Sequence, residues 1–208
     1  MNITLNWRGP IGVGNGGGSF PTDPSVLEEI DVPGVYLRLK SYDGGRGVHY
    51  VGQSRSILMR IDQHITALLS LQYPLRNGQG DRIGRGDFTD RINAYNRIES
   101  TLEAVAADVS RMRFFFAACD DDSGFQPDHL NLVEGALKTR LEQHAAARAG
   151  SASVENIQGV PASGFDGTIA IDSVFDHLDD TDRATLAAII GADPMEISEA
   201  LLGLGHAE

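Results

Sequence analysis

The sequence contains very little cysteine and no long apolar run. Its single cysteine, Cys119, excludes a disulfide framework and a cysteine-rich zinc site. No stretch approaches the roughly 18 consecutive apolar residues that a membrane-spanning helix needs. Residues 1–20 are polar and rich in glycine, so we expect no secretory signal and a cytoplasmic protein. Hydrophobic residues still make up 41% of the 208 residues, which is enough for a buried core and argues against wholesale disorder.

Basic residues are scarce overall, but not in the first part of the chain. The 17 Lys and Arg stand against 29 Asp and Glu, and this excess of acids argues against a non-specific nucleic-acid binder. Residues 1–118, however, hold 13 basic and 12 acidic residues, whereas residues 119–208 hold 4 and 17. Twelve of those 13 basic residues are Arg, which is suited to bidentate contact with phosphate. The argument against nucleic acid therefore applies only to the second part.

Two short β-prone runs predict a hairpin. Residues 35–40 alternate apolar and polar side chains, and residues 48–52 resume with β-formers after the turn Asp43-Gly44-Gly45. Residues 9–19, in contrast, contain too many glycines to hold a helix or strand, and we expect a flexible arm or loop there.

Apolar residues at helical spacing predict three further helices, beginning near residues 56, 90 and 127. The aromatic run at residues 112–118 predicts a central strand. After Pro161 the chain has one Arg, no Lys and ten acids, and we expect short helices at residues 182–190 and 194–202.

The expected fold class is α+β, a mixed α/β layer with few strands. We predict a small three-stranded antiparallel sheet flanked by helices, with a C-terminal acidic helical extension. The predicted parts are a glycine-rich N-terminal arm, a central domain with an irregular insertion at residues 72–88, and an acidic helical tail; they span residues 1–30, 31–158 and 159–208.

The hairpin carries a known pair of tripeptides. Gly34-Val35-Tyr36 and Tyr50-Val51-Gly52 resemble the paired signature of the GIY-YIG nuclease superfamily, with Val in place of Ile in both. Arg60, on the next predicted helix, falls where that family places its arginine. Arg60 and His64 together resemble the Arg-x-x-x-His pair of the GIY-YIG restriction endonucleases.

Two later residues extend the resemblance. Glu134 falls on the helix after the third strand, where the family places its metal-binding glutamate, and Asn156 falls where an asparagine closes the motif. The resemblance spans residues 33–158. It implies a metal-dependent endonuclease of restriction type that hydrolyses phosphodiester bonds in double-stranded DNA with Mg²⁺, for which Mn²⁺ can substitute.

The resemblance also implies a role for each residue. Two phenols act on the attacking water, a cation holds the scissile phosphate and one acid holds the metal ion. Tyr36 is then the general base or a proton relay, Tyr50 positions the water and the metal hydration shell, Arg60 grips the phosphate, His64 assists proton transfer or holds the phosphate, Glu134 binds the single metal ion, and Asn156 supports the site.

Physical reasoning on the same residues agrees with this scheme. Arg60 and His64 are four residues apart and therefore share one face of a helix. Glu134 lies between Leu130 and Leu137 on the apolar side of its helix, where an ionised carboxylate needs a compensating cation. A single carboxylate suits Mg²⁺, because that ion keeps much of its water shell.

Each residue also has a plainer interpretation. The tyrosines fit half-buried strand aromatics, Arg60 and His64 a solvated helix face, and Asn156 a loop cap. Glu134 could form an ion pair with Lys138, four residues later. The hypothesis therefore rests on the joint occurrence of these residues.

A second segment could contact DNA. The glycine-rich insertion carries Arg76, Arg82 and Arg85, which suit either a DNA groove or a plain surface loop. Other functions stay open: a catalytically inactive binding module that acts through protein contacts, or a DNA repair or mobile-element nuclease. We also consider a homodimer and a protein partner at the acidic tail, and we expect no membrane association.

Overall fold

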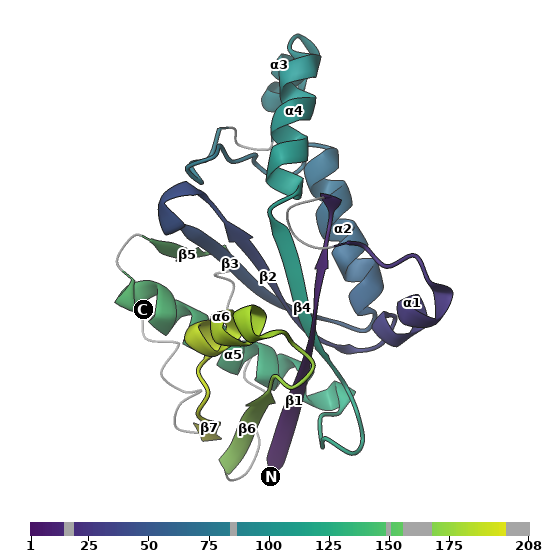
Figure 1. The fold of residues 1–208 in the computed structure, drawn as a ribbon, viewed down its shortest axis with the longest axis vertical. Coiled ribbons are helices and arrows are strands. Elements are labelled where there is room, and N and C mark those ends of the chain that lie inside the picture. The colour runs from purple at the N-terminus through teal and green to yellow at the C-terminus, as the bar shows by residue number, and fades with distance from the viewer. Residues whose placement is uncertain (15–18, 84–86, 149–150, 156–167, 199–208) are drawn as a thin grey trace.

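The structure is a computed structural model that describes residues 1–14, 19–83, 87–148, 151–155 and 168–198. Its centre is a seven-stranded mixed sheet in the order β5-β3-β2-β4-β1-β6-β7 (Figure 1). The predicted hairpin and central strand are present as three adjacent antiparallel strands, β2 (Gly34–Ser41), β3 (Gly47–Ser54) and β4 (Met112–Ala118). The prediction of a small three-stranded antiparallel sheet is nevertheless wrong, because four further strands extend it.

The first of these strands comes from the region predicted to be an arm. In β1 (Asn2–Gly12), Ile3, Leu5 and Trp7 alternate with more exposed residues and are fully buried, as in a strand with one face on the core. The strand pairs antiparallel with β4 and parallel with β6. Gly9 lies at a register shift against β4, where a Cβ atom would come 2.7 Å from the Phe114 carbonyl oxygen. The first glycine of this segment thus permits close strand packing instead of preventing it.

The acidic tail supplies strands as well as a helix. β6 (Thr168–Val174) buries Ile169 and Ile171 on one face, and β7 (Met195–Ser198) buries Met195 and Ile197 against it. The predicted helix at residues 182–190 is confirmed as α6 (Asp180–Ile190). The prediction of a helix at residues 194–202 is wrong for residues 195–198, which form β7. There, burial of every second residue and pairing with β6 outweigh the local signal for a helix start. The predicted helical extension is therefore corrected to a strand–helix–strand unit that completes the sheet.

Helices cover both faces of the sheet. On one face, α2 (Ile57–Leu69) and α4 (Ile98–Val109) contribute to an apolar cluster with Phe114 and Phe116 of β4. On the other, α5 (Leu130–Ala147) and α6 pack on β1 and on the opposite sides of β2 and β4. Figure 1 shows α3 (Phe88–Tyr95) and α4 projecting beyond the end of the sheet. The remaining elements are α1 (Pro24–Ile30), β5 (Ala152–Val154) and two 3₁₀ turns, η2 (Asp43–Gly45) and η3 (Pro127–His129).

The first predicted helix begins as expected. The Ser56 side chain caps α2 by accepting a hydrogen bond from the Met59 amide. The second predicted helix is divided into α3 and α4, with Asn96 and Arg97 between them. No helix in the described ranges combines the length and apolarity needed to cross a membrane.

Candidate functional site

The two hairpin tyrosines lie on the same face of the sheet. Tyr50 pairs with Arg38, two residues from Tyr36, and alternate strand residues share a face. The two phenol rings stack with their centroids 5.9 Å apart. Tyr36 pairs with Gly52 on the neighbouring strand, and a Cβ atom on Gly52 would clash with the Tyr36 hydroxyl oxygen. The glycine of the second tripeptide, Gly52, is therefore needed because only a residue without a side chain leaves room for the Tyr36 phenol.

Helix α2 brings its two predicted residues to that phenol. The Tyr36 oxygen lies 2.7 Å from Nε2 of His64, and Nε of Arg60 donates a hydrogen bond to the same oxygen at 3.2 Å. Tyr36 is fully buried and His64 is 1% exposed. Three residues predicted from separate motifs thus meet at one oxygen atom.

Burial sets the protonation of this group. Loss of solvent raises the pKa of Tyr36 well above its ordinary value, and Tyr50 adds to this while Arg60 opposes it. Burial, with the nearby charges of Arg38 and Arg60, lowers the pKa of His64 to about 2. At neutral pH the site therefore contains a phenol and a neutral imidazole, so His64 cannot act as an imidazolium acid.

Glu134 approaches from the other face of the sheet. It lies on α5, is 8% exposed, and forms a long ion pair with Lys138, whose Nζ is 3.5 Å from Oε1. Burial raises its pKa, and Lys138, Gln53 and the charge of Arg60 offset this only in part. Arg60 is thus bonded to Tyr36 and also close enough to act on Glu134. The structure joins Tyr36, Arg60 and His64 by direct contacts, whereas Glu134 lies on α5 and is influenced by the charge of Arg60.

The geometry at Glu134 fits one kind of metal site. Within the described residues, no group of three or more His, Cys, Asp or Glu could hold a metal ion. A single buried carboxylate whose pKa stays raised beside Lys138 would gain from a further cation. This donor set suits Mg²⁺ that keeps most of its water ligands.

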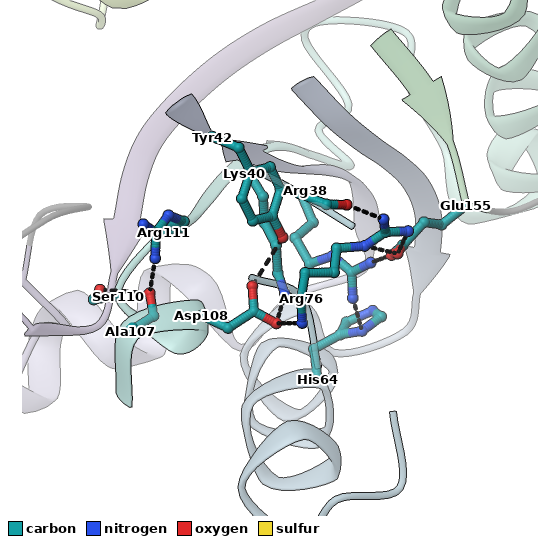
Figure 2. Close-up of polar contacts among 11 residues, drawn as sticks. Arg38, Lys40, Tyr42, His64, Arg76, Ala107, Asp108, Ser110, Arg111 and Glu155 are labelled. Carbon is teal, nitrogen blue, oxygen red and sulfur yellow. Dashed lines mark hydrogen bonds and ion pairs between the residues drawn. The ribbon is translucent and has the colours of Figure 1, made fainter. Parts of the chain in front are cut away.

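Four charged residues that belong to no motif in the sequence lie around the site. Arg38 reaches His64 Nδ1 at 3.1 Å through one terminal nitrogen and bonds Glu155 through the other (Figure 2). Next to it, Lys40 forms a 2.9 Å ion pair with the fully buried Asp108, which also accepts from the Tyr42 hydroxyl at 2.8 Å. Arg38 and Lys40 could have been found from their spacing, since they lie two and four residues after Tyr36 on a strand.

The insertion arginines differ in their placement. Arg76 is buried, donates to Glu155 at 2.9 Å and to the Gly80 carbonyl at 2.6 Å, and is therefore a structural residue, not an exposed DNA contact. Arg82 is exposed, pairs with Arg76 in an isolated β-bridge, and lines a pocket of about 180 Å³ with Arg38, Tyr50 and His64. Arg85 and Asn156 lie outside the described residues.

Comparison with known proteins identifies no relative: no family model, no curated protein and no solved structure matches this chain. The resemblance to the GIY-YIG nucleases therefore stays a prediction from the motifs.

Proposed function

We propose that this protein is a metal-dependent endonuclease that hydrolyses phosphodiester bonds in double-stranded DNA. The observation that carries the proposal is the meeting of Arg60 and His64 at the Tyr36 oxygen, with Glu134 within electrostatic reach of Arg60. These residues come from three separate elements, β2, α2 and α5.

The chain's own residues have separate tasks in this reaction. Arg60 supplies positive charge where a phosphate would carry developing negative charge. Tyr36 relays a proton from the attacking water: because its raised pKa keeps it a phenol, it accepts that proton only as it passes its own hydroxyl proton to a second water molecule. Neutral His64 holds the Tyr36 oxygen in place, and Tyr50 stacks beside it. Glu134 would hold Mg²⁺, or Mn²⁺ in its place, and the bound ion would supply charge compensation and a more acidic water.

The surroundings of the site suit an anionic substrate. The pocket beside Tyr50 and His64 is lined by Arg38, Lys40 and Arg82, and only Glu155 among its lining residues is acidic. Among nuclease types, the Arg60–His64 pair favours a restriction-type enzyme over a repair or mobile-element nuclease. A cytoplasmic location, a homodimer and a protein partner at the acidic tail are further proposals.

Plasmid cleavage tests the function directly. We expect the protein to convert supercoiled plasmid to nicked or linear forms with Mg²⁺ and not with EDTA, and Glu134→Ala to abolish this. Glu142→Ala, which changes an exposed glutamate on the same helix, should cleave like the wild type. Absence of cleavage with either metal ion would favour the inactive binding module. Discrete fragments would indicate a restriction enzyme, and a smear would count against it.

A further inference from the structure

We infer that Arg38 is a positioning residue that fixes the tautomer of His64, so that both neighbours of the Tyr36 oxygen donate hydrogen bonds to it. The inference rests on the proposed function for its catalytic meaning, but its structural content can be tested without any cleavage. It concerns a residue outside the family motif described above.

The argument begins with what a guanidinium group can do. Arg38 NH1 lies 3.1 Å from Nδ1 of His64. Every nitrogen of a guanidinium is a donor and none is an acceptor, so Nδ1 must present its lone pair to Arg38. A neutral imidazole carries one ring proton, which is then on Nε2, the nitrogen that lies 2.7 Å from the Tyr36 oxygen.

This assignment determines the direction of both hydrogen bonds at Tyr36. Nε2–H of His64 donates to the phenol oxygen, and so does Nε–H of Arg60 at 3.2 Å. The proton of Tyr36 must then point elsewhere. His64 therefore does not take the proton of Tyr36; this proton passes to a water molecule, and the Nε2–H of His64 stabilises the negative charge that then develops on the phenol oxygen.

Arg38 is itself held in place. Its other terminal nitrogen bonds Glu155 at the end of β5, and Glu155 also binds Arg76 (Figure 2). The side chain of Arg38 is only 4% exposed, and its guanidinium lies 5.0 Å from the centroid of the Tyr50 ring. With these contacts the guanidinium has little freedom to leave Nδ1.

Nitrogen NMR of the histidine ring reads the tautomer. In ¹⁵N-histidine-labelled wild-type protein at pH 7, we expect His64 to show a protonated Nε2 and an unprotonated Nδ1. Arg38→Met removes the donor, and a shift of the ring toward the Nδ1–H tautomer is expected. Arg38→Lys keeps a charged donor and should restore the wild-type pattern. His177, which is exposed, serves as an internal reference and should be unaffected.

Two results would overturn the inference. One is a wild-type His64 protonated on Nδ1, which needs no variant and so does not depend on the folding of Arg38→Met. The other is an unchanged tautomer in a folded Arg38→Met protein. In cleavage assays, Arg38→Met should lower the rate about 100-fold, within the usual range for a group that serves proton transfer, and Arg38→Lys should recover most of it. A wild-type protein with the inferred tautomer but no cleavage would refute the proposed function alone.

Discussion

The hydroxyl oxygen of Tyr36 lies 2.7 Å from Nε2 of His64, although 28 residues separate them in the chain. Both side chains are buried, one on a central strand and the other on the helix that covers it. A polar contact in such a place is expensive to leave unmade, so each partner constrains the other.

Tyr36→Phe removes the shared acceptor while it keeps the ring. We expect cleavage to fall by about 10²- to 10⁴-fold, the usual range for a lost acid–base group. Stability should fall by about 1–3 kcal/mol, because His64 and Arg60 lose their common acceptor. Nicking rates and urea unfolding measure the two effects. Tyr95→Phe, at an exposed tyrosine, should change neither, and a Tyr36→Phe enzyme with full activity would remove Tyr36 from the reaction.

Mg²⁺ should stabilise the folded protein through Glu134. A ligand present at about 100 times its dissociation constant adds about 2.7 kcal/mol to the free energy of unfolding. We therefore expect millimolar Mg²⁺ to raise the melting temperature of the wild type but not of Glu134→Gln. Glu142→Gln provides the matched control and should respond like the wild type. An equal rise in Glu134→Gln would place the metal ion elsewhere.

The Lys40–Asp108 pair should be important for stability. Asp108→Ala leaves Lys40 buried without its counter-charge, and we expect a loss of about 3–5 kcal/mol by urea unfolding. Combining it with Lys40→Met should recover much of this loss, because no unpaired charge is then buried. Asp62→Ala, at an exposed position of α2, should cost little. A double variant no more stable than Asp108→Ala would show that the charge is not the cause.

His64 should make the stability fall in mild acid. Because its pKa is lowered to about 2 in the folded protein, the unfolded chain binds the proton more readily between that value and about 6.5. The stabilisation is complete above pH 6.5 and is lost as the pH falls, by about 1.4 kcal/mol per pH unit. His64→Gln should remove about this slope from urea unfolding between pH 6 and 4. His177→Gln is the comparison variant at an exposed histidine, and an identical slope in both variants would contradict the buried, neutral assignment of His64.

Arg82 should contribute to DNA affinity through charge alone. Arg82→Ala is expected to weaken binding of a DNA duplex and to reduce the slope of log affinity against log salt by about one. Arg183→Ala, at an exposed arginine on α6, is the control variant and should bind the duplex with the same affinity and salt dependence as the wild type. Equal affinities for the wild type and Arg82→Ala at low salt would remove this residue from the DNA surface.

The part of the fold that could be predicted is the part with unambiguous local signals. The hairpin and the serine cap of α2 follow from turn and capping residues. The missed strands have only short alternating patterns, and glycines or acids beside them suggested other structures. Ile169 and Ile171 lie in a strand because β1 pairs with them, and this contact between distant parts of the chain cannot be seen in the local sequence.

The site shows the same limit. Tyr36, Arg60 and His64 could be predicted together because their motifs are compact and their spacing fixes a face. The burial of Arg38 and Lys40 could not be predicted, because alternation of apolar and polar residues along a strand usually means that the polar side chains face solvent. Here helices cover both faces of β2, so the polar side chains are buried and must find partners from distant segments, Asp108 and Glu155.

Strand β1 runs beside β6, and the amino group of Met1 donates to the Thr168 carbonyl, 167 residues away in the chain. During synthesis on the ribosome, β1 therefore has to wait for its parallel neighbour, while β2, β3 and β4 are already available to pair with one another. Throughout this interval the nascent chain would expose the unpaired backbone N–H and C=O groups along the edge of β1. We therefore expect this edge to be where aggregation begins or a chaperone binds.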